Sequence, residues 1–436
     1  MAEAGGKDEA DLPSSPLHVY YRKMPRKTEY NIPQEIVIEI LKRVPVESLL
    51  RFMCVSKSWF SLITNPNFVS DHLSCQSNPI SKDSMCTLFR VNSRLFLHQL
   101  HEPIDEWTEI HSPMENIGEI VGCCHGVVCL FDYFSRFYRP LILWNPSIRK
   151  AVYVRFKIPA FDKKMSILVN PATLYFSFGF GLDLVSKDYK VVRVCYNWIE
   201  ACNTMYLHTD ICSLSKNGWT RYVTIIEGDR FILECKGVYV NGFIHWICTK
   251  KHGSFVISKT IWTFDLANNV FSEIHLPLRV ALGSIAVLMS VKMVEDKLAV
   301  SCTDSGGNVL DRDYKDSGVN VWVMMEYGNP KSWRRLIDIY LGGNLGKIMG
   351  ALITGDGKTV VATSVGNLIS WDCNSENIEN IALPILDPDF MNVYVPSLVL
   401  LRCNNEALRC IELPLKKKKK RNKETGTRKH RVFAAG

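Results

Sequence analysis

The sequence lacks the short motifs that mark several common classes of protein. No Cys-x-x-Cys or His-x-x-x-His pair occurs in its 436 residues, so the usual ligand spacing of a zinc site is absent. It has no Asn-x-Ser/Thr glycosylation site, no apolar core of a signal peptide near the N-terminus, and no apolar run long enough to span a bilayer. These absences predict a protein of a reducing intracellular compartment, in the cytoplasm, the nucleus or both, with no membrane partner.

Three stretches resemble catalytic or nucleotide-binding motifs but lack essential parts. GCCHG (122–126) places its cysteines on opposite faces of an expected strand and its histidine in a hairpin turn. GGNLGKIM (342–349) has three residues between its glycines where a phosphate loop needs four, and no Ser or Thr follows its lysine. FGFG (178–181) is no dinucleotide fingerprint, and Gly179 and Gly181 are expected to ease a bend in a strand. The sequence therefore predicts a protein that is not an enzyme, with no metal and no cofactor.

Cysteine is present but forms no framework. The fifteen cysteines are odd in number and scattered, and many lie inside apolar runs, such as Cys129 in VVCLF and Cys248 in FIHWICT. Such cysteines act as small hydrophobic core residues.

The basic charge is confined to the C-terminal end. The net charge is +8, but ten Lys and Arg fall between 416 and 431 against one acid, which leaves 42 basic and 43 acidic residues elsewhere. The rest of the chain is thus almost neutral, which argues against nucleic acid as a partner. The tail, 414–436, is expected to be disordered, either as a solvated charge run or as a nuclear-localisation signal. The candidate signal is Lys416, Lys417, Lys418, Lys419, Lys420 and Arg421.

The chain divides into four parts by pattern. Residues 1–28 are poor in large apolar side chains and are expected to be disordered. Residues 29–73 have the apolar spacing of helices, and residues 85–403 consist of short β-like runs separated by turn signals. The basic tail follows.

The helical part is predicted to contain three short helices. Pro33 suits the first turn of the first helix, which ends at Pro45. Its apolar face comprises Ile36, Val37, Ile40, Leu41 and Val44. The second helix has Val46, Leu49, Leu50, Met53 and Cys54 on one side. Ser56 is expected to cap a third helix that ends at Asn65-Pro66.

The β part contains a degenerate internal repeat. Tight turns such as His125-Gly126 and Asn241-Gly242 precede apolar runs, and such turns recur at intervals of about 55 to 60 residues. Each repeat supplies two hairpins, hence a four-stranded sheet, and radially arranged sheets form a β-propeller. We predict a kelch-like propeller of about six blades, closed by a strand at 394–401. An irregular β-sandwich is the alternative.

The helical part has more large apolar residues than three short helices can hide from each other. They either pack on the β part or form a docking surface for another protein. The run IPQEIVIEILKRVPVESLLRFMCVSKSWFSLITNPNF resembles an F-box, the short helical motif that binds the Skp-type adaptor of SCF cullin–RING ubiquitin ligases. Two departures are Ile32 where the motif has Leu before Pro, and Met53 where it has Arg before Cys.

The β part is similar to the type 1 F-box-associated, kelch-like domain of a large family of plant proteins. The segments that carry this similarity are GCCHGVVCL, LWNPSIRKA, FGFGLDLVSKDYKVVRV and GVYVNGFIHW. The two resemblances together imply a non-catalytic substrate receptor of an SCF ubiquitin ligase, whose partners are the adaptor, through it the cullin–RING ligase, and an unknown target protein. The alternatives are an F-box scaffold outside ubiquitination and a carbohydrate-binding propeller.

The resemblance also implies which residues face the adaptor. They are Ile32, Pro33, Ile36, Ile40, Leu41, Val46, Leu49, Leu50, Val55 and Trp59, of which Trp59 and Ile40 are expected to serve the helical core as well. Target contacts are expected in loops at one end of the propeller, with 159–175 and 303–318 as the first candidates.

Overall fold

The structure, a computed structural model, describes residues 32–76 and most of residues 86–412. Its gaps after Cys86 are 92–93, 100–106, 114–118, 132–140, 155–174, 200–202, 217, 228–229, 234–235, 253–254, 283–285, 293–295, 305–317, 341–347, 354–357, 364–366, 373–377, 383–389 and 400–408. The two expected disordered ends, almost all of the two candidate target loops, and most of GGNLGKIM lie outside the described residues. No helix among the described residues is long and apolar enough to cross a membrane.

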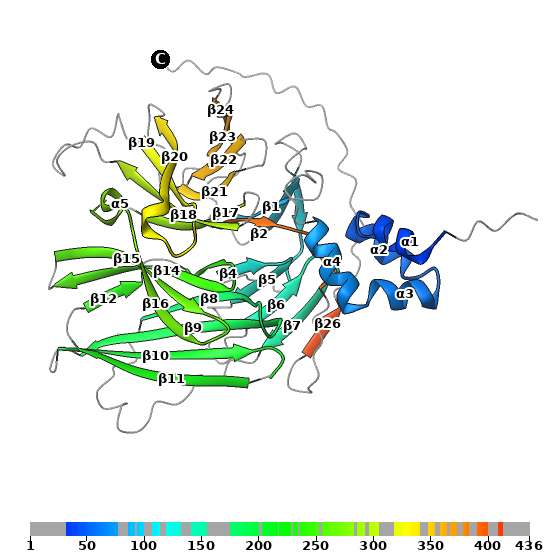
Figure 1. The fold of residues 1–436 in the computed structure, drawn as a ribbon, viewed down its shortest axis with the longest axis horizontal. Coiled ribbons are helices and arrows are strands. Elements are labelled where there is room, and N and C mark those ends of the chain that lie inside the picture. Colours follow the sequence, from blue (N-terminus) through cyan, green and yellow to red (C-terminus); the bar gives the residue numbers. More distant parts are fainter. Residues whose placement is uncertain are drawn as a thin grey trace, which may run out of the picture.

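Four helices form a unit at one end of the molecule (Figure 1). They are α1 (Gln34–Leu41), α2 (Val46–Phe52), α3 (Lys57–Ile63) and α4 (Pro66–Gln76). Pro33 and Pro45 immediately precede α1 and α2, and the Ser56 side chain accepts a hydrogen bond from the Trp59 N–H at 3.2 Å, so the predicted cap of α3 is confirmed.

The third helix ends before Asn65-Pro66 as predicted, but the helical part contains a fourth helix that was not predicted. Pro66 begins α4, because a proline at the first helical position gives up an N–H that would have no partner there. Asn65 accepts a hydrogen bond from the Asn67 N–H at 2.9 Å and so caps this fourth helix. On α4, His72 is fully buried, and its Nε2 lies 2.9 Å from the Val44 carbonyl, which ties α4 to the loop after α1.

The described strands form six antiparallel sheets, which we number along the chain. Sheet 1 contains β1 (Cys86–Val91), β2 (Arg94–Gln99), β3 (Trp107–Ile110) and β25 (Phe390–Tyr394). Sheet 2 contains β4 (Glu119–Cys124), β5 (Val127–Phe131), β6 (Leu141–Asn145), β7 (Lys150–Val154) and β26 (Arg409–Glu412). Sheet 3 contains β8 (Tyr175–Asp183), β9 (Asp188–Ile199), β10 (Thr204–Ser213) and β11 (Gly218–Glu227).

The remaining three sheets follow in chain order. Sheet 4 contains β12 (Arg230–Leu233), β13 (Val238–Val240), β14 (Phe243–His252), β15 (Phe255–Asp265) and β16 (Val270–His275). Sheet 5 contains β17 (Ala286–Lys292), β18 (Asp296–Asp304), β19 (Gly318–Met324) and β20 (Trp333–Tyr340). Sheet 6 contains β21 (Ile348–Ile353), β22 (Lys358–Thr363), β23 (Asn367–Asp372) and β24 (Ile378–Ala382). A short helix, α5 (Leu278–Leu282), precedes sheet 5, and a 3-10 turn, η5 (Pro330–Ser332), precedes β20.

The six sheets follow one another around a closed ring, which is a β-propeller. Contacts between inner strands join β25 to β4, β4 to β8, β8 to β14, β14 to β17, β17 to β21, and β21 back to β25. Strands such as β5 and β6 are buried along their whole length, because each sheet has a neighbour on both faces. A sandwich of two sheets is therefore excluded.

The ring closes differently from the prediction. The closing strand is β25, which pairs with β1, whereas residues 395–399 of the predicted strand 394–401 form no strand. A second late strand, β26, adds to the outer edge of β7 and was not predicted.

The ring has two different ends. We count the strands of each sheet from the axis of the ring outward. Because neighbouring strands are antiparallel, the connections from the first to the second strand and from the third to the fourth strand lie at one end, which we call the turn end. The His125-Gly126 and Asn241-Gly242 turns lie there, with the positive φ that such turns require. The strand ends that flank residues 155–174 and 305–317 lie by the same rule at the opposite end, which we call the loop end.

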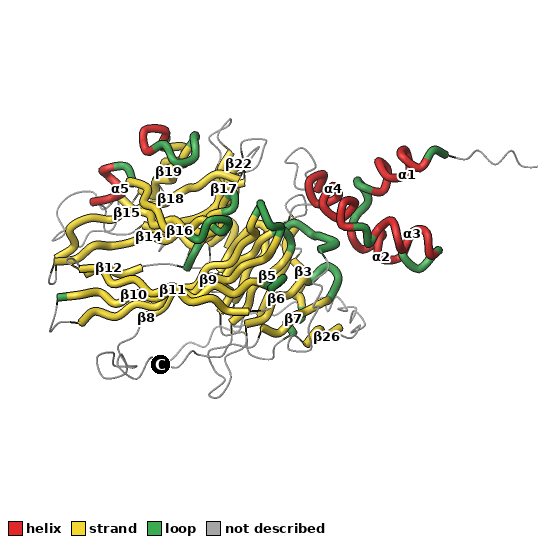
Figure 2. Tube along the Cα trace, turned by 60° about the horizontal axis from the view of Figure 1, so that its bottom comes forward, coloured by secondary structure: helices red, strands yellow, loops and turns green. Residues whose placement is uncertain are grey.

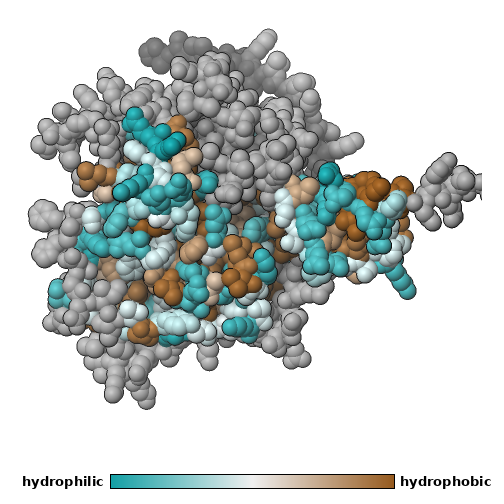
Figure 3. All heavy atoms as spheres, in the orientation of Figure 1, coloured by the Kyte–Doolittle hydropathy of each residue, from teal (hydrophilic) through white to brown (hydrophobic). Residues whose placement is uncertain are grey.

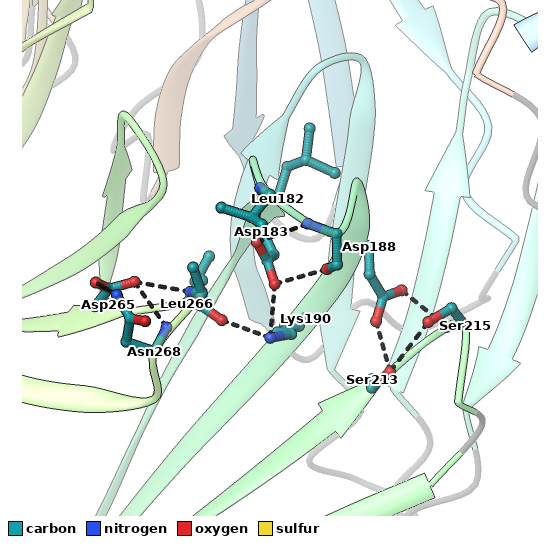
Figure 4. Close-up of polar contacts among 12 residues, drawn as sticks. Leu182, Asp183, Asp188, Lys190, Ser213, Ser215, Asp265, Leu266 and Asn268 are labelled. Atoms are coloured by element: carbon teal, nitrogen blue, oxygen red, sulfur yellow. Dashed lines mark hydrogen bonds and ion pairs between the residues drawn. The ribbon is translucent and has the colours of Figure 1, made fainter.

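The turn end is tied together by polar contacts between sheets (Figure 4). Lys190 pairs with Asp183 at 2.9 Å and donates a hydrogen bond to the Leu266 carbonyl of the β15–β16 turn, which joins sheet 3 to sheet 4. Burial alone would raise the pKa of Asp183, but hydrogen bonds from Ser186, Lys190 and the turn backbone lower it to about 2.

The axis of the ring is filled by sheet 4. β13 contacts β4, β8 and β17, which belong to three other sheets. A Cβ at Gly181 would lie 2.1 Å from the Tyr239 ring, and one at Gly179 would lie 2.3 Å from Ile244. The two glycines thus allow close approach of the next sheet, a role that was not predicted from the sequence.

Candidate functional site

The helical unit exposes a set of large apolar side chains. We define the apolar patch as Ile32, Pro33, Ile36, Ile40, Val55 and Phe60, all of which are exposed. Its five large members are each between 51 and 68% exposed, which is unusual for side chains of this kind. Figure 3 shows hydrophobic surface gathered on the part of the unit that faces away from the sheets.

The patch has its basis in the periodicity of α1. Ile32, Ile36 and Ile40 recur every fourth residue, and residues at this spacing lie on one side of a helix. Val37 and Leu41, one position further on, turn to the interior, where Leu41 is 2% exposed. The single apolar face that the sequence predicts for α1 is therefore divided between the core and the surface.

Three of the predicted adaptor-facing residues lie in the core of the helical unit. Leu41, Val46 and Leu49 are at most 2% exposed and pack with Ile63 and Phe68, so they support the patch from within. The expectation that they face a partner is corrected accordingly.

Two further predicted residues are half-buried. Trp59 packs edge-on against Phe52 with ring centroids 5.3 Å apart, as expected for a residue that also serves the helical core, and Leu50 borders the same core. Ile40, which was expected to be mixed, is 54% exposed. Phe60 was not predicted to face a partner. It is an apolar residue on α3 that does not share the buried side with Ile63, and this position in the helix is the signal that could have identified it.

Charged residues brace the helices beside the patch. Lys42 lies 3.0 Å from Glu39 on α1 and 3.0 Å from Asp71 on α4, and Arg43 lies 3.3 Å from Glu39. The hydrogen bond and charge of Lys42 lower the pKa of Glu39, and the hydrogen bonds to Glu39 and Asp71 raise the pKa of Lys42. These four charged residues are paired with one another, whereas the apolar side chains of the patch are exposed.

The patch is large enough to support docking. Complete burial of one large apolar side chain contributes about 1.5–3 kcal/mol, so a half-exposed one contributes about 1 kcal/mol on docking. The five large side chains together offer about 5 kcal/mol.

Burial makes Cys123 of the GCCHG segment a poor nucleophile. Burial raises the pKa of Cys123 to about 12, so its thiol stays protonated. Cys124 is buried, and His125 occupies the expected hairpin turn with φ of 49°.

One group of potential metal ligands occurs among the described residues, on β9 and β10. Cys195, His208 and Asp210 bring their ligand atoms within 4.8 Å of one another. Asp210, however, is bound by the guanidinium groups of Arg193 and Arg221, whose charges oppose a cation. Burial lowers the pKa of His208 to about 4 and raises that of Cys195 to about 12. The arrangement is a buried ion-pair network of the sheet.

Comparisons with known proteins agree with this division of the chain. Residues 30–71 match the F-box domain, and residues 80–401 match the F-box associated beta propeller domain. The F-box/kelch-repeat protein At3g23880 of Arabidopsis thaliana is 28% identical over 79% of this chain and 89% of its own length. The F-box protein CPR1 of the same plant is 25% identical over 86% of this chain and 90% of its own length.

A solved structure of an alpha-L-arabinanase from Penicillium chrysogenum, complexed with arabinobiose, is 9% identical, with a TM-score of 0.38 over 60% of this chain and 79% of that one.

The F-box match covers the helical unit with its apolar patch, and the propeller match covers most of the ring of sheets. The chain therefore belongs to the family of F-box proteins that carry an F-box associated β-propeller domain.

Proposed function

We propose that this protein is a substrate-recognition subunit of an SCF ubiquitin ligase. Its apolar patch docks on the Skp-type adaptor, and through it on the cullin–RING ligase, while the propeller binds a target protein. The observation that supports this role most directly is an exposed apolar patch on a unit that matches the F-box domain.

The chain contributes proximity, without catalysis of its own. A ubiquitin-loaded enzyme supplied by the ligase and a target lysine held by the propeller react faster because binding raises their effective concentration. The helical unit lies at the turn end, so we place target binding at the loop end, where the connections 155–174 and 305–317 leave the ring.

We also propose that the six sheets are the blades of one six-bladed ring, with β25 closing the first blade. The unit boundaries that we propose are 29–76, because α4 ends at Gln76, and 85–412, because β26 ends at Glu412. Nuclear import through residues 416–421 stays a proposal, tested by deleting the tail and observing where the protein accumulates.

Adaptor docking is tested with a double variant in the patch. Ile36→Asp with Ile40→Asp places two charges on the exposed stripe of α1 and leaves the helical core unchanged. We expect affinity for a purified recombinant Skp-type adaptor to fall about 100-fold or more, because central apolar anchors carry most of the energy of an interface. The thermal unfolding midpoint should stay within about 2 °C of the wild type, since surface changes cost little.

The matched control is Val185→Asp, which places a charge on an 81% exposed apolar residue of the β8–β9 turn. This variant should bind the adaptor as the wild type does. Undiminished binding by the double variant would refute docking through the patch, and failure of the wild type to bind any Skp-type adaptor would refute the proposed function.

A further inference from the structure

The five residues that follow the closing strand join the propeller to the helical unit. We call residues 395–399 the strap. It follows β25 directly and has no regular secondary structure. Ser397 is completely buried and Leu398 is 2% exposed, so these two residues of the strap are enclosed by the rest of the protein.

One side of the strap is bound to sheet 2. The Asn145 side-chain amide, at the end of β6, donates hydrogen bonds to the Ser397 carbonyl at 3.2 Å and to the Val399 carbonyl at 3.1 Å. The hydroxyls of Tyr394 and Ser147, one residue before the strap and in the β6–β7 turn, are hydrogen-bonded at 2.6 Å.

The β4–β5 turn packs against the same side of the strap. A Cβ at Gly126 would lie 2.4 Å from the Ser397 hydroxyl and 2.6 Å from the Val395 carbonyl, so the glycine permits this contact. Turns of sheet 2 therefore hold the strap at two places.

The other side of the strap belongs to the helical unit. Leu398 packs in one cluster with Leu41, Val46, Leu49, Ile63 and Phe68, the core residues of α1 to α4. Ile148, from the β6–β7 turn, borders the same cluster. Successive side chains of an extended segment point in opposite directions, which lets Leu398 face the helices while Val399 packs against the core shared by sheets 2 and 3.

The core of the helical unit is thus completed by a residue that is more than 300 positions away in the sequence. The covalent connection alone, residues 77–85, is long enough to span about 30 Å when extended. It would leave the helical unit free to take many orientations, whereas the strap selects one. Figure 2 shows the helical unit standing beside one end of the sheets, with described loops between the two.

We propose that Asn145 and Leu398 are positioning residues that hold the F-box and the propeller as one rigid body. Asn145 fixes the strap to the propeller, and Leu398 fixes the helical unit to the strap. On the proposed function, on which this consequence rests, the joint sets the distance and direction from the ligase to the bound target. The orientation of the propeller relative to the ligase then depends on the strap, a segment that comes from the C-terminal side of the propeller itself.

The joint is tested by measuring the distance between the two units in single molecules. Donor and acceptor dyes are attached through non-canonical amino acids at Ser61 on α3 and Ser272 on β16, both exposed. The wild type should give a single narrow distribution of energy-transfer efficiency. Leu398→Ala should raise the population of other orientations about 100-fold, since loss of a buried leucine side chain costs on the order of 2.7 kcal/mol.

A second variant and two controls keep the outcome clear. Asn145→Ala releases the strap from the propeller side and should also broaden the distribution, although the helical core is untouched. Leu398→Met, which keeps a large apolar side chain, should give the same narrow distribution as the wild type. Leu278→Ala, at a 74% exposed leucine of α5, should leave the distribution unchanged as well. The midpoint of propeller unfolding is measured for each variant, so that broadening with an unchanged midpoint reports the joint alone.

A broad distribution in the wild type would overturn the proposal, and so would narrow distributions in both Leu398→Ala and Asn145→Ala. The measurement needs no partner protein. A narrow wild-type distribution with no adaptor binding would refute the proposed function and leave the rigid joint supported.

Discussion

The strongest prediction about stability concerns Asp210, the acceptor of a buried charge network in sheet 3. Its carboxylate receives hydrogen bonds from Arg193 Nε at 2.9 Å and Arg221 Nε at 2.7 Å, and it pairs with a second nitrogen of Arg193. The side chain of Asp210 is 1% exposed and that of Arg193 is 8% exposed, whereas that of Arg221 is 27% exposed. Asp210→Asn removes the charge and keeps the shape.

The expected cost follows from what remains buried. Breaking a buried ion pair by removing one partner typically costs about 3–5 kcal/mol, because the other charge stays buried without compensation. Arg193 is buried and would lose the carboxylate that faces it, while Arg221 can turn partly to water. We therefore expect Asp210→Asn to lower the free energy of unfolding by about 3 kcal/mol.

The assay is denaturant unfolding of the full chain, followed by tryptophan fluorescence at neutral pH. The matched control is Glu273→Gln, which removes the pair with Lys250 at 3.3 Å, where both side chains are about one-third exposed. Such a pair contributes about 0–1 kcal/mol. A cost for Asp210→Asn no larger than that of Glu273→Gln would refute the reasoning.

The pH dependence of the difference gives a second check. Burial alone would raise the pKa of Asp210, but the hydrogen bonds and charges of Arg221 and Arg193 lower it below the usual value. A carboxyl group with a lowered pKa in the folded state stabilises the protein above its unfolded pKa and loses that contribution as the pH falls toward the folded pKa. The difference between the wild type and Asp210→Asn should therefore be complete at neutral pH and shrink only in strong acid.

Three further predictions rest on other described residues. Burial lowers the pKa of His208 and His245 to about 4, so unfolding takes up protons below pH 6.5, and stability should fall as the pH drops from 6.5 to 4 by at most about 3 kcal/mol for each histidine. Replacement of both by glutamine should flatten this profile in acid unfolding experiments. Gly181→Ala should cost about 1–3 kcal/mol in denaturant unfolding, because its Cβ would lie 2.1 Å from a neighbouring tyrosine ring, whereas Gly218→Ala, whose Cβ meets nothing closer than 3.7 Å, should cost much less. Ser56→Ala should cost about 1 kcal/mol through loss of the cap of α3, and a change below about 0.3 kcal/mol would contradict the role of this cap.

Local chemistry was sufficient to predict much of the helical unit. The cap at Ser56 and the prolines before α1 and α2 are short-range signals, and the structure agrees with them. The fourth helix was missed because Asn65-Pro66 is both a helix stop and a helix start, and only the packing of Phe68 and His72 on the other helices decides between the two.

The division of the apolar residues between core and surface was not predictable from periodicity. Ile36 and Ile40 are exposed, while Val37 and Leu41 turn inward, yet all four have similar hydropathy and adjacent helical positions. Which side of α1 is covered depends on α2, α4 and Leu398, and the last of these is contributed from the far end of the chain. The β repeats predicted the ring, because the turns are local, but not the strand that closes it.

The direction of β26 has a practical consequence for work with tagged protein. It places Glu412 opposite Lys150, two residues after Ile148, which borders the helical core. The four residues from Glu412 to Lys416 span at most about 14 Å, so the basic run begins close to the joint between the propeller and the helical unit. A fluorescent protein fused directly after Glu412 would therefore crowd this joint, and a changed orientation of the two units in such a fusion would report the position of the tag.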